Sequence, residues 1–191
     1  MQNSHIIGGE FGINLQGFQY AQSNNGFLEG IYKYSSGRSA LYYILLDVQK
    51  RYGITTAYLP NYLCSSVVVA AEKSQVKVVF YNLNDQLEID IEKFPLDDNE
   101  KAAVLLINYF GLKSLQLQVE LVRSISMEAI VIEDDVQAFY EFCKPELAAD
   151  YKFTSLRKTF ACPDGGLVKT AKQLTVVTEV NKFHQFKLAG C

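Results

Sequence analysis

Lys158 is the residue in this sequence with the clearest capacity for covalent chemistry. It ends the run Ser155–Lys158, which leaves an apolar stretch typical of a strand, and an aspartate and two glycines follow at 164–166. A lysine that is partly desolvated or placed among other cations gives up its proton more easily, and the neutral amine can form an imine with an aldehyde. The alternative is an ordinary surface lysine, and the residue type alone does not decide between the two.

Three consecutive carboxylates, Glu133–Asp135, end a second apolar stretch. Clustered carboxylates can bind Mg²⁺, although the sequence offers no second oxygen-rich cluster to complete such a site. They can also form a solvated turn. In a third interpretation, one carboxylate faces a heterocyclic nitrogen and keeps it protonated. The sequence pattern leaves these three interpretations open.

The segment Ser36–Ser39 precedes a helical pattern and carries hydroxyl and guanidinium groups. The first backbone N–H groups of a helix and the helix dipole favour an anion, and a glycine at position 37 lets the backbone approach a phosphate closely. An ordinary helix cap with an exposed arginine is the alternative interpretation.

The elements that must position these residues follow from the apolar patterns. Apolar residues between Ala40 and Val48 repeat at helical spacing, and Gly53 ends the predicted helix. A second helix is expected over 114–126 with Ser114 as its cap, and 65–73 fits a buried helix. Strands are predicted at 55–59, 76–83, 102–110, 129–132, 150–156 and 166–170, with a polar surface excursion at 84–100.

These strands are apolar nearly throughout, and helices separate several of them. That pattern predicts an α/β fold, a three-layer sandwich in which helices cover both faces of a mostly parallel sheet. Ligands of such sheets bind at the carboxyl ends of the strands. We therefore expect Ser36–Ser39, Glu133–Asp135 and Ser155–Lys158 to converge on one site.

Composition narrows the class of protein. The chain has 191 residues, 49% of them hydrophobic, and a formal charge of -3, so one well-packed domain is expected and a nucleic-acid partner is not. No apolar run approaches the length of a membrane helix, and the first residues do not read as a secretory signal. Four scattered cysteines and two histidines predict reduced thiols in a cytoplasmic protein and no metal site.

The order of four motifs carries a family resemblance. Ser-Gly-x-Ser-Ala-Leu begins at residue 36, Leu-Pro-x-Tyr-x-Cys at 59, Ile-Glu-Asp-x-x-Gln-Ala at 132, and Ser-x-x-Lys at 155 with two glycines after it. This ordered set resembles the DegT/DnrJ/EryC1/StrS aminotransferases, which are pyridoxal 5′-phosphate (PLP) enzymes. The resemblance runs from about residue 8 to residue 170 and implies the large domain of a PLP-dependent transferase.

The resemblance also implies roles for particular residues. Lys158 would hold PLP as a Schiff base and later move a proton, and Asp134 would pair with the pyridinium nitrogen. Gln137 would lie near the cofactor's 3-hydroxyl group. The remaining cofactor contacts would come from the phosphate-binding residues and from the residue against the face of the ring. These are Gly37, Arg38, Ser39, Ser155 and Cys64.

Several features depart from the family pattern. Cys64 stands where relatives usually place an aromatic residue or histidine against the PLP ring, and Asp135 and Val136 follow the key aspartate where small residues are usual. Family members are also longer and continue into a small C-terminal domain. The chain is thus expected to be one PLP-binding large domain over 1–191, with an N-terminal arm at 1–35, a helix starting near 181, and no small domain.

The predicted function is amino transfer from a donor such as glutamate to a keto-sugar or related carbonyl acceptor, by a homodimer. The alternative is a non-catalytic fragment, or a PLP-binding module that needs a partner chain. Because the closing domain is missing from the expected architecture, we predict PLP binding with little transaminase activity.

Overall fold

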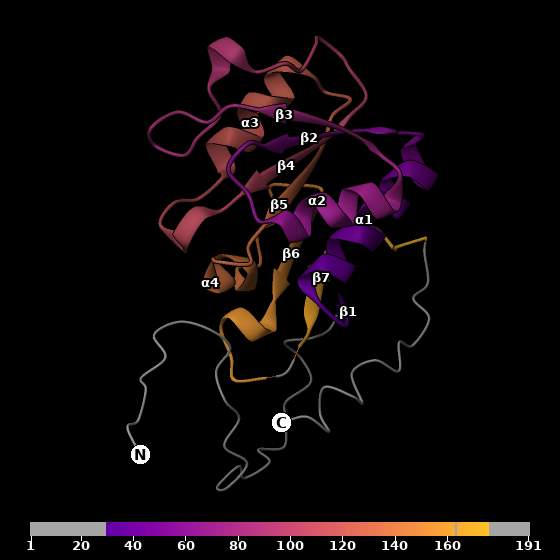
Figure 1. Ribbon diagram of the computed structural model, residues 1–191, viewed down its shortest axis with the longest axis vertical. Coiled ribbons are helices and arrows are strands. Elements are labelled where there is room, and N and C mark those ends of the chain that lie inside the picture. The colour runs from indigo at the N-terminus through magenta and orange to yellow at the C-terminus, as the bar shows by residue number, and fades with distance from the viewer. Residues whose placement is uncertain (1–29, 163, 176–191) are drawn as a thin grey trace, which may run out of the picture.

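The apolar runs of the sequence form one seven-stranded sheet, in the order β1-β7-β6-β5-β4-β2-β3 (Figure 1). The structure is a computed structural model that describes residues 30–162 and 164–175. The strands are β1 (Ile31–Tyr34), β2 (Thr56–Pro60), β3 (Lys77–Tyr81), β4 (Ala103–Ile107), β5 (Ile130–Asp134), β6 (Tyr151–Ser155) and β7 (Gly166–Lys169).

The five strands from β2 to β6 run parallel, and β7 pairs antiparallel with both β6 and β1. Every residue of β4, β5 and β6 is buried. Parallel strands covered on both faces need apolar side chains on both sides, and this explains why the runs do not alternate with polar residues. The prediction of a mostly parallel sheet is confirmed.

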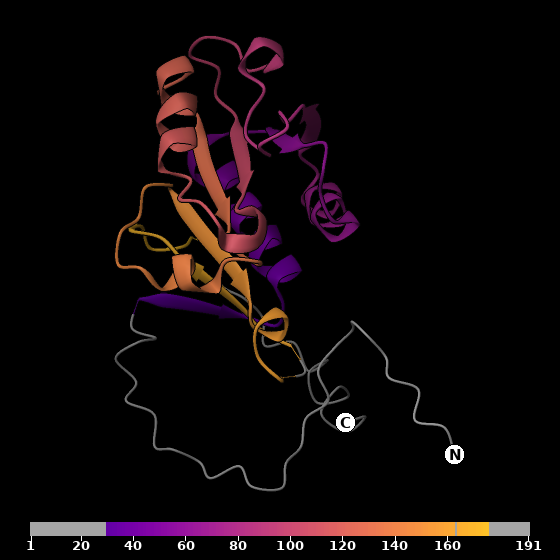
Figure 2. The same cartoon turned by 90° about the vertical axis from the view of Figure 1, so that its left-hand side faces the viewer.

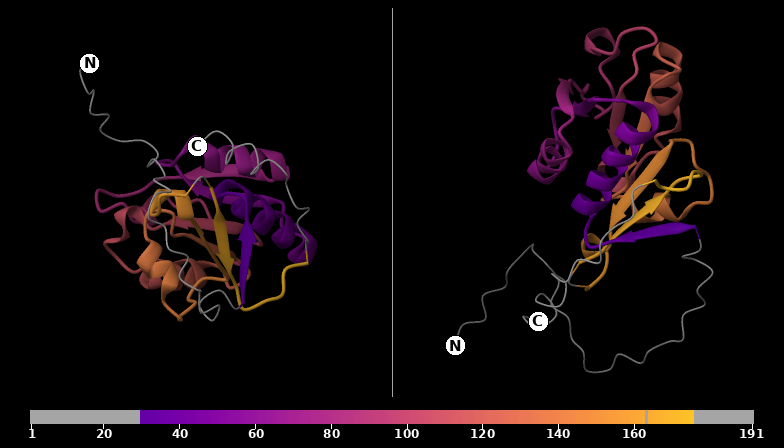
Figure 3. Two further views of the ribbon diagram at one scale, coloured as in Figure 1. Left: turned by 90° about the horizontal axis from the view of Figure 1, so that it is seen from below. Right: turned by 90° about the vertical axis from the view of Figure 1, so that its right-hand side faces the viewer.

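Helices cover both faces of the sheet. The helices α1 (Gly37–Tyr52) and α2 (Ser65–Ser74) pack on one face, while α3 (Gln116–Ile125) and the short α4 (Phe139–Cys143) lie on the other. Figures 2 and 3 show α2 and α3 on opposite sides of the strands. Three 3₁₀ turns complete the described elements: η2 (Ile91–Lys93), η3 (Tyr109–Gly111) and η4 (Leu156–Lys158). The three-layer α/β sandwich is therefore as predicted.

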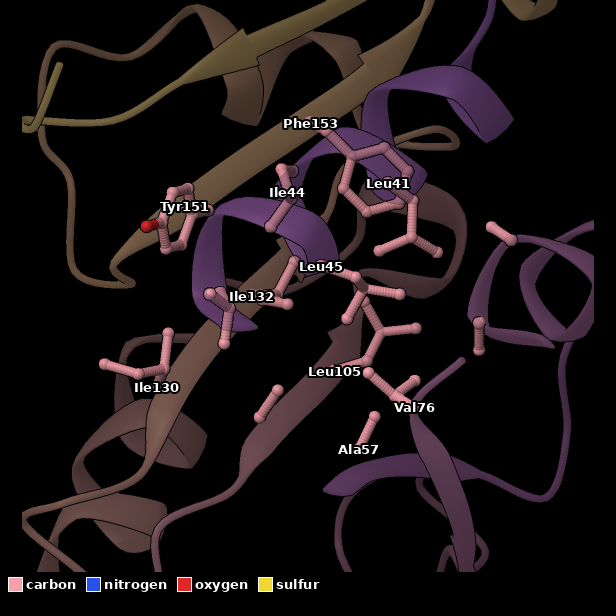
Figure 4. Packing of buried hydrophobic residues seen from close by; sticks show 14 of the residues in the cluster. Leu41, Ile44, Leu45, Ala57, Val76, Leu105, Ile130, Ile132, Tyr151 and Phe153 are labelled. Atoms are coloured by element: carbon pink, nitrogen blue, oxygen red, sulfur yellow. The ribbon is translucent and has the colours of Figure 1, made fainter. Parts of the chain in front are cut away.

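The α1 helix forms the centre of the larger core. Its apolar face contacts side chains from β4, β5 and β6, as the close view in Figure 4 shows for Leu41, Ile44 and Leu45 against Ile132 and Phe153. The Ser36 hydroxyl accepts a hydrogen bond from the N–H of residue 39 and caps the helix start. Gly53 adopts φ 69° at the other end, a conformation that costs glycine little.

Some predicted boundaries were wrong. Residues 31–34, assigned to an N-terminal arm, form the edge strand β1, and α4 was not predicted at all. Pro60 is the last residue of β2 rather than the residue after it, and Ser114 lies one position before the helix cap. The rest of the arm and the predicted helix near 181 lie outside the described residues.

Candidate cofactor site at the carboxyl end of the sheet

The start of α1 lies directly against the end of β6. A Cβ atom on Gly37 would stand 3.0 Å from the Cβ of Ser155, so position 37 has room only for glycine unless Ser155 moves. Gly166 is even more restricted, because its Cβ would stand 2.2 Å from the Ser36 carbonyl oxygen. These close approaches bring two of the three predicted motifs together and explain the glycine at position 166.

Three serine hydroxyls gather at the same helix start. The Ser39 hydroxyl lies 3.0 Å from those of both Ser35 and Ser36. Each hydroxyl has one hydrogen to donate, so two contacts among three hydroxyls leave one hydrogen for an outside acceptor. The N–H groups of Gly37 and Arg38 belong to the first turn, which has no intrahelical partners, and Arg38 is exposed. This helix start has the donor groups that an anion requires.

Asp134 ends β5 on the face of the sheet that α1 covers. It is only 5% exposed, and its carboxylate accepts one hydrogen bond from the Val136 N–H at 2.9 Å. Burial raises the pKa of Asp134 to about 7, because desolvation penalises the ionised form more than that hydrogen bond stabilises it. A buried carboxylate of this kind is a candidate partner for a cationic group of a ligand.

Gln137 lies just beyond Asp134 and is tied to the loop after β4. Its side-chain oxygen accepts from the Phe110 N–H at 3.2 Å, which leaves the amide NH₂ group as a donor. In the same loop the Tyr109 hydroxyl donates to the Tyr62 carbonyl, and the two rings stack with centroids 5.7 Å apart. Sequence reasoning did not assign Tyr109 to the site, although an aromatic residue straight after a strand end is a usable signal.

Lys158 is exposed in the turn η4 after β6, and Cys64 is exposed at the start of α2. Hydrogen bonds from Ser66 lower the pKa of the Cys64 thiol, against the opposing effect of burial, and the positive charge of Lys158 lowers it further. The two side chains are therefore electrostatic neighbours although they are far apart in the sequence. The structure thus places Lys158, Cys64, Asp134, Ser155 and the α1 start at one end of the sheet.

The three consecutive carboxylates do not act as one group. Side chains alternate along a strand, so Glu133 and Asp135 lie on the face opposite to Asp134, next to Lys152. All three are buried, which contradicts the solvated turn.

Within residues 30–162 and 164–175, no group of three or more histidine, cysteine or acidic side chains is placed to hold a metal ion, and no helix is long and apolar enough to cross a membrane.

An apolar cavity of about 440 Å³ lies beside this site rather than at it. Leu156 and Gly166 border it, but it contains none of the predicted catalytic side chains. Its lining is Lys33, Tyr34, Phe139, Leu156, Phe160, Cys162, Gly165, Gly166 and Leu167. We place the candidate site at the polar groups, because the helix start can bind an anion and Asp134 has a raised pKa, whereas the lining of this cavity is mainly apolar.

No family model and no curated protein matches the sequence. Among solved structures, NtdA from Bacillus subtilis with bound PMP has a TM-score of 0.60 at 21% identity, over 78% of this chain and 35% of that one. A DegT DnrJ EryC1 StrS aminotransferase from Brucella abortus has a TM-score of 0.56 at 15% identity, over 78% and 44%.

The E. coli GDP-4-keto-6-deoxy-D-mannose-3-dehydratase with bound hydrated PLP is also similar, with a TM-score of 0.59 at 16% identity over 78% of this chain and 41% of that one. The chain therefore spans less than half the length of these three structures. In its fold, as in the order of its motifs, this chain resembles the DegT/DnrJ/EryC1/StrS aminotransferases and related PLP-dependent enzymes.

Proposed function

We propose that this chain binds PLP at the carboxyl end of its sheet and belongs to an enzyme of the aminotransferase type, with Lys158 as the residue that holds the cofactor covalently. This proposal rests on one observation. A helix start with donors for an anion, a buried carboxylate and an accessible lysine all lie at the carboxyl end of the sheet. Each feature alone is common in proteins. Together they match the phosphate, the ring nitrogen and the aldehyde of one cofactor.

The phosphate end of the cofactor fits the start of α1. Gly37, Arg38 and Ser39 supply backbone and side-chain donors there, and the Ser155 hydroxyl lies against the same turn. The helix has 16 residues, so its dipole favours a dianionic group at this end. An added Cβ at position 37 would stand 3.0 Å from the Cβ of Ser155. Because glycine has no Cβ, the backbone N–H at this position can approach a phosphate closely.

The ring end of the cofactor fits Asp134. A buried carboxylate whose pKa is raised to about 7 gains most from a cationic partner, because the ion pair offsets the desolvation of both groups. A carboxylate facing the ring nitrogen would keep that nitrogen protonated. The Gln137 amide would reach the 3-hydroxyl group, and Cys64 would pack against one face of the ring.

When bound, PLP supplies an electron sink that permits proton loss from the α-carbon of an amino donor. Lys158 would supply the amine that moves this proton between the α-carbon of the donor and C4′ of the cofactor. The substrates that we propose are an amino donor such as glutamate and a carbonyl acceptor, a keto-sugar or a related compound. The whole chain would form one cofactor-binding domain.

A PLP-binding module that requires a partner chain is the second candidate. Lys158 is exposed, and apolar side chains stand open near the same edge, with Tyr62 and Phe110 each 59% exposed. Exposed aromatic groups beside a polar site are typical of surfaces that another chain covers. A homodimer would satisfy this requirement, and so would a different polypeptide that closes the site.

The test is borohydride trapping of PLP on the purified chain. We expect visible absorbance that survives dialysis, and a reduced cofactor mapped by mass spectrometry to the peptide that contains Lys158. Lys158→Ala should lose both signals. Lys73→Ala, which removes an exposed lysine of α2, should keep them. A Lys158→Ala variant that remains as yellow as the parent after dialysis would show that the lysine assignment is wrong.

A further inference from the structure

A group of three buried charged residues lies behind the candidate site, on the opposite face of the sheet. Glu133 lies in β5, Asp135 follows the last residue of that strand, and Lys152 lies in β6; they are 3%, 0% and 5% exposed. We refer to them as the buried charge cluster. The proposed function uses none of these residues, and charges this deeply buried require a physical explanation.

Lys152 sits between the two carboxyl groups but closer to one of them. Its Nζ lies 3.3 Å from Glu133 Oε2 and 3.7 Å from Asp135 Oδ2. Glu133 and Lys152 are also direct cross-strand partners. The other Asp135 oxygen, Oδ1, accepts from the Asn108 amide at 3.3 Å. Asp135 Oδ2 is buried and has no hydrogen-bond partner within the part of the chain that the structure describes.

Two carboxylates and one ammonium would leave one uncompensated negative charge. The neighbouring ionisable groups do not correct this, because two are acids, two are lysines and one is a thiol: Glu141, Cys143, Lys144, Glu146 and Lys169. A proton on Asp135 Oδ2 would remove the excess charge. It would also turn an unpartnered acceptor into a donor, and the Glu133 carboxylate lies within hydrogen-bonding reach as its acceptor. Asp135 is the better place for the proton because Lys152 stabilises the Glu133 anion at shorter range.

We propose that Asp135 holds a proton at neutral pH, shares it with Glu133, and thereby forms a neutral buried cluster that fixes the ends of β4, β5 and β6. The direction of the pKa of Asp135 agrees: burial and then the charge of Glu133 raise it to about 8, and Lys152 opposes them. Asp135 is a positioning residue here. The inference concerns the unliganded chain and does not depend on the proposed cofactor.

The cluster connects directly to the backbone that carries Asp134. Asn108, which donates to Asp135, also donates its backbone N–H to the Asp134 carbonyl at 3.0 Å. The Thr154 hydroxyl donates to the Asp135 carbonyl at 2.9 Å, and the Asp135 N–H donates to Phe153. Adjacent carboxyl groups thus have different tasks. Asp134 faces the candidate site, and Asp135 holds the strand ends behind it.

The test measures proton uptake through stability. A folded-state pKa above the unfolded value means that the folded chain binds the extra proton, so stability from this group falls as pH rises from about 4 to about 8. Between pH 5 and pH 7, the folded-to-unfolded ratio of the parent should fall about 100-fold relative to that of Asp135→Asn, at tenfold per pH unit for one proton. Asp98→Asn, a change in an exposed loop, should follow the parent.

Two further measurements complete the test. In Asp135→Ala, the amide of Val136, which bonds to Asp134, should exchange hydrogen faster, whereas Asp135→Asn should protect it. If Asp135→Asn does not fold, carbon-13 NMR of the parent decides: a protonated Asp135 carboxyl at pH 7 supports the proposal. An ionised carboxyl overturns it. An unchanged pH dependence in Asp135→Asn, or an unchanged Val136 exchange rate in Asp135→Ala, would also overturn it.

Discussion

Replacing Asp134 by asparagine should stabilise the unliganded chain at alkaline pH. Asp134 is 5% exposed, and among the described residues its carboxylate accepts a single hydrogen bond, from the Val136 N–H, so its ionised form is poorly compensated. Asparagine has nearly the same shape and can keep that hydrogen bond through its side-chain oxygen, but it carries no charge to desolvate. A candidate cofactor-binding residue would then be one whose removal increases stability, as expected where a site trades stability for function.

The magnitude follows from the pKa of Asp134. Burial raises it from an ordinary 3.8 to about 7, a difference of about 3 units, and each unit corresponds to about 1.36 kcal/mol. Because the folded-state value is the higher one, the stability from protonation is complete below pH 4 and is lost as pH rises to about 7. Asp134→Asn should therefore be more stable than the parent by about 4 kcal/mol at pH 8, and by only about 1–2 kcal/mol at pH 5.

Urea unfolding of the parent and Asp134→Asn at pH 5 and pH 8, without PLP, measures this difference. Asp98→Asn is the matched control, since it removes one carboxylate from an exposed position. Equal stability of the parent and Asp134→Asn at both pH values would refute the argument that Asp134 is desolvated. So would a constant difference that does not depend on pH.

The same variant also bears on the proposed function. With PLP added, Asp134→Asn should still bind the cofactor through the phosphate contacts and Lys158. Conversion of the bound cofactor by glutamate should slow by orders of magnitude, because a neutral amide does not hold a proton on the ring nitrogen. If Asp134→Asn keeps the parent rate and Asp135→Asn loses it, the pairing role lies at position 135.

Further predictions concern packing, assembly and activity. Gly166→Ala should destabilise the fold by about 2 kcal/mol or more in thermal unfolding, because its Cβ would overlap the Ser36 carbonyl, whereas Gly53→Ala, with open space and φ 69°, should cost about 1 kcal/mol. Tyr151→Phe removes a buried 2.7 Å hydrogen bond to Asp47 and should lower the free energy of unfolding by about 1–3 kcal/mol at pH 7, measured by urea unfolding. Because the pKa of Asp47 is lowered, this loss of stability should become smaller only below about pH 4. Light scattering at micromolar concentration should give a homodimer or larger, and a monomer would contradict this. Glutamate should convert bound PLP more slowly than about 1 per second, because Lys158 and Cys64 are exposed to water in this chain, and a faster rate would contradict this expectation.

The sequence by itself determined much of the secondary structure. The spacing of apolar residues from Ala40 to Val48, with a serine before and Gly53 after, specified α1 because caps and periodicity are local properties. Strands that are apolar on both sides indicated a parallel sheet between helices. The edge strand β1 was not predicted because, unlike the equally short β7, it has no fully buried residue, and its partner β7 lies about 135 positions later in the chain.

Only the tertiary structure decided how the candidate residues relate to one another. Three carboxylates in a row had three interpretations, and the choice depended on where β5 ends and on which residues cover each face. Extending the strand through Asp134 puts that residue on the α1 face and puts Glu133 and Asp135 beside Lys152. The sequence around Cys64 likewise does not indicate that this residue lies close enough to Lys158 for the lysine charge to lower its pKa. Residues distant in the sequence bury a carboxyl group and pair with its charge, and so they set its pKa. Residue type and spacing show only which chemistry is available.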